Sequence, residues 1–192
     1  MAFRNIGAIG VAIAVLGTSA FAQTEEKKAP SKAKFNIGIK GGVYLPSQSV
    51  MKDVFGSSIF VFGLSFDDFS KQADKWRLTL DFDFISGRRD DDKFFAAPVM
   101  ASFGRVFGTP EDDFRPFVRV GAGVAYFDYS ITHPDTSERF STKRLGFGGD
   151  IEAGFFINDK FRLSAKYLVF SKTDEFDFSG LQITATYNVF KF

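Results

Sequence analysis

The sequence has 192 residues, with 24 Lys plus Arg against 23 Asp plus Glu, so its length indicates one domain and its near-neutral charge argues against a nucleic-acid-binding protein. It contains no cysteine, which excludes a disulfide, a thiolate metal site and a cysteine nucleophile. Its 27 phenylalanines imply that many strand faces are buried or face lipid, because Phe is strongly apolar and favours strands.

The N-terminus has the pattern of a secretory signal peptide over residues 1–22. Arg4 precedes the apolar stretch "IGAIGVAIAVLG", and "AFA" ending at Ala22 is a small-x-small cleavage pattern. The apolar stretch is short for a membrane-spanning helix, although a retained anchor is the alternative, and no cysteine follows to carry a lipid. Residues 23–34, "QTEEKKAPSKAK", are expected to form a flexible lead-in. The expected folded domain is therefore 35–192, in an exported protein.

Alternation of apolar and polar residues is the main structural signal in the rest of the chain. In "WRLTLDFDF" (76–84), one side carries only apolar residues and the other carries Arg77, Thr79, Asp81 and Asp83, which predicts a β-strand with two different surroundings. No convincing helical period is found. Strands are expected at 35–44, 58–66 (apolar on both sides), 76–84, 94–107 (with ambiguous parity), 115–129, 144–157, 161–170 and 181–189. Eight successive strands predict an all-β, eight-stranded antiparallel up-and-down barrel.

Two kinds of barrel fit this pattern, a soluble barrel with an apolar interior and a transmembrane β-barrel with the faces reversed. Glycines on the polar faces (Gly38, Gly121, Gly123, Gly146, Gly148 and Gly154) suit the narrow lumen of eight strands. Aromatic residues lie near the strand ends, as in the girdles of membrane barrels. The connections at 45–57, 86–93, 130–142 and 171–178 together exceed those at 67–74, 108–113 and 158–159, as outer loops exceed periplasmic turns. These patterns favour the membrane barrel.

The charges of the polar face are expected to form a stabilising network inside the lumen. They have mixed sign on neighbouring strands, so they can neutralise one another where unpaired charges would be costly. The predicted lumen network consists of Lys40, Arg77, Asp81, Asp83, Arg119, Asp150, Glu152, Arg162 and Lys166. Eight strands filled in this way leave too little space for an open pore, although a narrow or gated path is an alternative.

"PVMASFGRVFG", "RPFVRVGAGVAYFDY" and the C-terminal "YNVFKF" resemble segments of the small eight-stranded outer-membrane barrels of the OmpX/OmpA-like type. The resemblance implies a location in the outer membrane with both termini in the periplasm. It also implies that Phe190 and Phe192 form the aromatic C-terminal signal read by the barrel-assembly machinery. Both have the opposite parity to Tyr187 and Val189, so either a bulge near Asn188 shifts the register or the last residues lie at the rim.

Residues suited to catalysis or metal binding are few. Some small outer-membrane barrels modify lipid A with a His, a Ser and a carboxylate, but the single histidine, His133, lies before Pro134 in an expected loop, and the spacing to Ser130, Ser137 and Glu138 does not reproduce that motif. The acidic runs Asp90–Asp92 and Asp174, Glu175 and Asp177 lack the spacing of a calcium loop. We therefore predict no catalytic residue, metal or cofactor.

The function expected from the sequence is that of an outer-membrane barrel with a plugged polar lumen. Its surface loops would serve envelope integrity, adhesion or surface interaction, and its partners would be outer-membrane lipid and lipopolysaccharide. A small channel for hydrophobic or small solutes is the alternative, and a lipid A-modifying enzyme ranks third.

Overall fold

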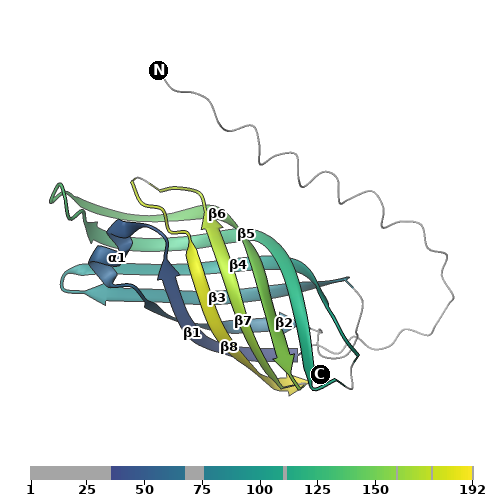
Figure 1. The fold of residues 1–192 in the computed structure, drawn as a ribbon. Coiled ribbons are helices and arrows are strands. Elements are labelled where there is room, and N and C mark those ends of the chain that lie inside the picture. Colours follow the sequence, from purple (N-terminus) through teal and green to yellow (C-terminus); the bar gives the residue numbers. More distant parts are fainter. Residues whose placement is uncertain (1–35, 68–75, 110–111, 159, 174, 192) are drawn as a thin grey trace. The chain divides into compact units, whose positions relative to one another are not determined.

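The computed structural model describes residues 36–67, 76–109, 112–158, 160–173 and 175–191, which form a closed barrel. Each strand pairs with its neighbour in sequence, and β1 pairs antiparallel with β8 to close the sheet (Figure 1). The predicted eight-stranded up-and-down barrel is confirmed. The predicted signal peptide and lead-in lie outside the described residues.

The strands are β1 (Asn36–Pro46), β2 (Ile59–Asp67), β3 (Trp76–Arg89), β4 (Asp92–Val106), β5 (Phe114–Thr132), β6 (Arg139–Ile157), β7 (Phe161–Phe170) and β8 (Gly180–Lys191). Between β1 and β2 lies a seven-residue helix, α1 (Ser49–Phe55), where no helix was expected. It forms because Met51 and Val54, three residues apart, turn to the same side and are buried in the barrel mouth. Within the described part of the chain, no helix is both long and apolar enough to cross a membrane.

The two faces of the sheet differ as the alternation predicted. On β3, Asp81 and Asp83 are buried inside the barrel, whereas Leu78 on the outer face is 73% exposed. The same holds on β6, where Glu152 is buried and Ile151 is 68% exposed. An apolar exterior around a polar interior is the arrangement of a membrane barrel.

The predicted connections at 86–93 and 130–142 were wrong, because most of these residues belong to strands. Pairing of β3 with β4 continues from Ser86↔Phe95 to Arg89↔Asp92, and β5 and β6 are each 19 residues long. A spanning strand needs only about 9–11 residues, so β5 and β6 project well beyond an apolar belt. In Figure 1 the β3–β4 and β5–β6 hairpins reach past α1.

The barrel has two distinguishable ends. We call the end with α1 the loop end; it carries the connections 47–58, 90–91, 133–138 and 171–179. The opposite end, the turn end, holds the connections of β4 to β5 and of β6 to β7, the start of β1 and the end of β8.

An apolar cluster that the sequence did not indicate fills the lumen at the loop end. This apolar cap consists of Tyr44, Met51, Val54, Ile59, Val61, Ile85, Phe94, Ala96, Met100, Ala125, Phe127, Tyr129, Ile131, Leu168, Phe170, Phe176 and Phe178. The ring of Phe178 stacks on Phe94 and Phe127 at centroid distances of 4.9 and 5.0 Å. The cap explains why β2 read as apolar on both sides: Ile59 and Val61 point inward, and Phe60 and Phe62 point outward.

Hydrogen bonds fasten α1 and the connection 171–179 over the apolar cap. The Gln48 side chain donates to the Glu175 carbonyl at 2.9 Å and accepts from the Asp177 amide at 2.9 Å. The Tyr44 hydroxyl donates to the Phe178 carbonyl. Arg89 donates to the Asp53 carbonyl at 3.2 Å, at the C-terminal end of α1, where carbonyls lack helical partners. These hydrogen bonds therefore hold α1 and the connection 171–179 across the barrel mouth at the loop end, and β1 and β3 supply the Tyr44 and Arg89 side chains that fasten them.

A bulge near the end of β8 reverses the side-chain parity. Ile37 pairs with Phe190 and Gly38 pairs with Asn188, so Val189 is the extra residue. Phe190 consequently lies on the outer face, 55% exposed, which bears out the bulge alternative. Phe192 lies outside the described residues.

Candidate functional site

The middle of the lumen is a layer of buried charges contributed by five strands. Its centre is formed by Lys40 of β1, Asp81 and Asp83 of β3, Arg119 of β5, Glu152 of β6 and Lys166 of β7. Each occupies an inward position of its alternating strand. Strands far apart in the sequence thus bring opposite charges together inside the closed sheet.

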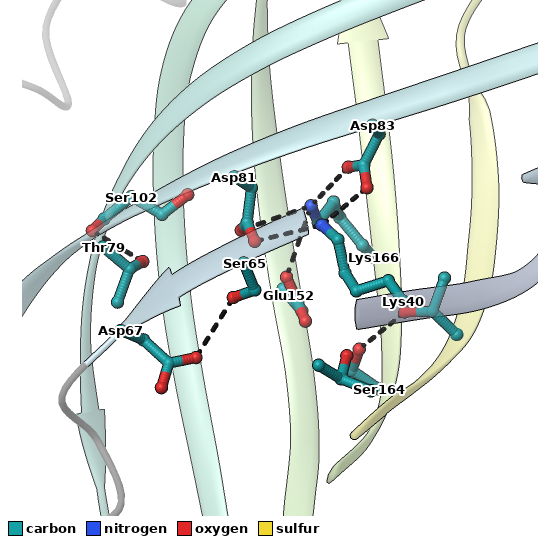
Figure 2. Close-up of polar contacts among 12 residues, drawn as sticks. Lys40, Ser65, Asp67, Thr79, Asp81, Asp83, Ser102, Glu152, Ser164 and Lys166 are labelled. Carbon is teal, nitrogen blue, oxygen red and sulfur yellow. Dashed lines mark hydrogen bonds and ion pairs between the residues drawn. The ribbon is translucent and has the colours of Figure 1, made fainter. Parts of the chain in front are cut away.

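Two lysines lie between the two carboxylates of β3 (Figure 2). The Lys40 Nζ is 3.0 Å from Asp81 Oδ1 and 2.5 Å from Asp83 Oδ1. The Lys166 Nζ, from the other side, is 3.0 Å from Asp83 Oδ2 and 3.5 Å from Asp81 Oδ2. These four side chains are at most 1% exposed, so their charges are compensated by one another rather than by water.

Arg119 links β3 to β6 across the lumen. Its Nη2 is 2.6 Å from Asp81 Oδ2, and its Nε donates to Glu152 Oε2 at 2.7 Å. Its Nη1 donates to the Thr79 hydroxyl at 3.1 Å. A guanidinium is suited to this position because its planar donors satisfy several acceptors at fixed angles.

Arg162 forms a second group nearer the turn end. It pairs with Asp67 at 2.5 Å and donates to Ser65 Oγ at 3.0 Å. Its guanidinium carbon lies 5.7 Å from the ring centre of Phe117 and 5.9 Å from that of Phe156, which adds cation–π contacts. Asp67 was missed by the sequence analysis because the strand end was placed at residue 66.

The remaining predicted residues lie apart from this centre. Asp150 is buried and, among the described residues, accepts a hydrogen bond from the Ser102 hydroxyl alone, at 3.4 Å to either oxygen. Arg77 is half-buried towards the turn end, where it pairs in register with Gly104 of β4. Arg115, which the sequence analysis did not single out, is 1% exposed.

The buried charges balance in number. Among the described residues, the buried charged side chains are Lys40, Arg115, Arg119, Arg162 and Lys166 against Asp67, Asp81, Asp83, Asp150 and Glu152. An uncompensated charge in such an interior would cost several kcal/mol, so this balance is what makes a lumen filled with charged side chains tolerable.

Glycines make room for the side chains that fill the lumen, as the sequence indicated. A Cβ added to Gly121 would lie 2.8 Å from Asp150 Oδ2, and one added to Gly148 would lie 2.5 Å from Phe170 Cδ1. Both are closer than a carbon atom tolerates, so the lumen is packed to the backbone at these points.

His133 lies in the short β5–β6 connection. Its Nδ1 accepts from the Asp135 amide at 3.3 Å, while Ser130 accepts from Arg139 Nε at 2.9 Å. The imidazole is thus engaged by the loop's own backbone. Within the described residues, no group of three or more His, Asp or Glu side chains is arranged to hold a metal ion.

The chain is similar to a family of outer-membrane barrels in sequence and to several solved outer-membrane proteins in structure. The sequence profile of the "Outer membrane protein beta-barrel domain" family matches residues 8–188. The N-terminal β-barrel domain of Pseudomonas aeruginosa OprF is 15% identical, with a TM-score of 0.50 over 82% of this chain and 98% of that one. No curated protein sequence matches significantly.

Two further solved structures have similar scores. The outer membrane enzyme PagL is 15% identical, with a TM-score of 0.54 over 79% of this chain and 99% of that one. Ail, the attachment invasion locus protein of Yersinia pestis, is 16% identical, with a TM-score of 0.51 over 84% of this chain and 100% of that one. At such identities these likenesses concern the fold.

Proposed function

Because the chain belongs to the outer membrane protein beta-barrel domain family, we propose that it is a closed, non-conducting barrel that presents its loop end at the cell surface. The family places it in the outer membrane, in contact with outer-membrane lipid. Its role would be adhesion, another surface interaction or the integrity of the envelope. The observation that carries this proposal is the double closure of the lumen, by the balanced charge layer and by the apolar cap.

The closure argues against the transport alternative. An open path needs a continuous aqueous route, but Asp81, Arg119 and Lys166 are at most 1% exposed. Above them, α1 and the connection 171–179 seal the mouth. What remains exposed to carry function is the outer rim, where the β3–β4 and β5–β6 hairpins project. One structural relative is described as an attachment invasion locus protein, which is in keeping with an adhesive role.

The proposed orientation follows from the N-terminal sequence and the chain direction. A signal peptide over residues 1–22 would export the protein, residues 23–34 would remain as a lead-in, and the barrel of 35–192 would insert with both termini in the periplasm. Phe190, on the outer face after the bulge, would form the assembly signal with Phe192, read by the barrel-assembly machinery. The turn end would then face the periplasm, and the loop end the exterior.

A catalytic role has less support. PagL is described as an outer membrane enzyme, but here His133 accepts a hydrogen bond from its own loop, and the nearby Ser130 is bonded to Arg139. If lipid A from cells expressing the protein shifts in mass, and the shift disappears with His133→Ala, the enzymatic reading replaces ours.

Electrical recording in planar bilayers tests the proposal. We expect the purified mature protein to give no steady conductance, because the charge layer and the apolar cap both block the lumen. Deletion of 49–55, which removes α1, is the informative comparison: the charge layer alone should still prevent steady opening. Regular unitary steps from the intact protein would refute the closed barrel and favour the transport alternative.

A further inference from the structure

An exposed row of cations lies on the outer face of the projecting hairpins. Arg88 of β3 and Lys93 of β4 are register partners, and Lys143 of β6 pairs in register with Asp128 of β5. All three cations are exposed on outward positions of their strands. We call Arg88, Lys93 and Lys143 the basic row.

The basic row begins directly where the apolar exterior ends. Moving towards the loop end, outward positions change from Phe95 to Lys93 on β4 and from Leu145 to Lys143 on β6, in one step of two residues. Leu145 is 70% exposed and therefore belongs to the lipid-facing surface. The cations thus stand at the height where lipid head groups meet the hydrocarbon.

The row carries more positive charge than its neighbours neutralise. Lys93 and Lys143 both pair with Asp128, at 3.6 and 3.4 Å, while none of the described carboxylates pairs with Arg88. Arg139, on the same face, donates to Ser130 and to the Asp91 carbonyl. Further acids, Asp90 among them, lie in the β3–β4 turn beyond the row.

The geometry also shows that two cations of the row reach one anion. Lys93 and Lys143 stand on strands separated by β5, about 10 Å apart. Their ammonium groups nevertheless converge on the single carboxylate of Asp128, and they remain 56% and 66% exposed. A phosphate at this position would offer up to two charges and more acceptor oxygens than that carboxylate.

We propose that the basic row binds the phosphate groups of lipopolysaccharide in the outer leaflet. The inference rests on the proposed orientation, in which the loop end faces the exterior. Bound phosphate would engage Lys93, Lys143 and Arg88 together, in competition with Asp128. The site would hold the barrel at a defined depth and surround it with ordered glycolipid.

Native mass spectrometry of the full mature chain in micelles, titrated with purified lipid A, tests this. The variant Lys93→Gln/Lys143→Gln should bind lipid A about 25-fold more weakly, because each cation near an anionic surface contributes roughly fivefold. The matched control is Lys52→Gln/Lys172→Gln, which removes two exposed loop-end cations outside the row. The control should bind like the unaltered protein, and Asp128→Asn should bind more tightly.

If both double variants lose the same amount of lipid A binding, the protein attracts lipid A only through its net charge, and the proposed site is wrong. The site is also wrong if neither double variant loses binding. Competition by inorganic phosphate at lipid A concentrations would also overturn it, because the site would then recognise free phosphate. A chemically dephosphorylated lipid A should lose binding to the unaltered protein.

Orientation is checked separately. Since the chain has no native cysteine, Asp135→Cys can be labelled on intact cells with an impermeant maleimide. If labelling succeeds and the lipid A result is negative, the inference fails while the proposed orientation stands. If labelling fails, the proposed orientation is wrong whatever the binding result.

Discussion

Replacing Arg119 with methionine removes the cation that joins Asp81 to Glu152 while keeping an unbranched side chain of similar volume. The loss is not shared equally by the two carboxylates. Asp81 keeps Lys40 at 3.0 Å and Lys166 at 3.5 Å. Among the described residues, Glu152 keeps an ion pair with Lys166 alone, at 3.7 Å. The substitution therefore leaves Glu152 buried and poorly compensated.

Breaking a buried ion pair from one side costs about 3–5 kcal/mol, most of it from the stranded partner. We expect Arg119→Met to reduce the free energy of unfolding by that amount. Adding Glu152→Gln should recover part of the loss, because it removes the stranded charge. The matched control is Lys143→Met. The Lys143 side chain is 66% exposed, so its ion pair with Asp128 is expected to contribute less than about 1 kcal/mol to stability.

The assay is urea unfolding in lipid vesicles, followed by fluorescence of the single tryptophan, Trp76, which lies 55% exposed on the outer face. Gel mobility before and after boiling reports the folded fraction independently. If Arg119→Met costs no more than Lys143→Met, the lumen is hydrated and the buried network does not act as a plug. If adding Glu152→Gln to Arg119→Met lowers the free energy of unfolding further instead of restoring part of it, the assignment of Glu152 as the uncompensated charge is wrong.

Three further substitutions or probes test other parts of the structure. Gly148→Leu should lower the free energy of unfolding by several kcal/mol or prevent folding, because the added Cβ would lie 2.5 Å from Phe170. The control is Gly41→Leu, since an added Cβ there meets open space. If both variants shift equally on the heat-shift gel, the lumen is not tightly packed at Gly148. Met51→Ala should cost about 2–5 kcal/mol of packing and speed proteolysis within 47–58; an unaltered cleavage rate would show that α1 does not seal the cap. Trp76 emission should be quenched by brominated lipids, and an unquenched signal would place this outer position in water.

The strands and their faces were predictable because alternation is strong wherever one face meets lipid and the other meets the lumen. Residues Leu78 to Asp83 illustrate this, since apolar and polar positions strictly alternate there. The same signal put most of the charges of the predicted lumen network on one face of their strands, but it could not say which would pair. Pairing depends on the register between strands distant in sequence, such as β3 and β7.

The loop end was less predictable because the interior of the barrel is apolar there rather than charged. The apolar cap puts Val61 and Phe127 inside, so alternation disappears where both faces are apolar. The strand extensions around Arg88 and Lys93 read as a loop because their charges resemble turn chemistry. The α1 helix was detectable in principle from Met51, Val54 and Phe55 at helical spacing, although seven residues give a weak period.

Cysteine labelling of the lumen tests the closed barrel most directly. Ser102 points inward beside the charge layer and is 0% exposed, and Ser141 lies exposed on the projecting part of β6. In vesicles, we predict that a water-soluble maleimide modifies Ser141→Cys readily and Ser102→Cys only after unfolding in urea. Equal rates for both positions in the folded protein would mean that water fills the lumen, and the closed surface barrel would have to be abandoned.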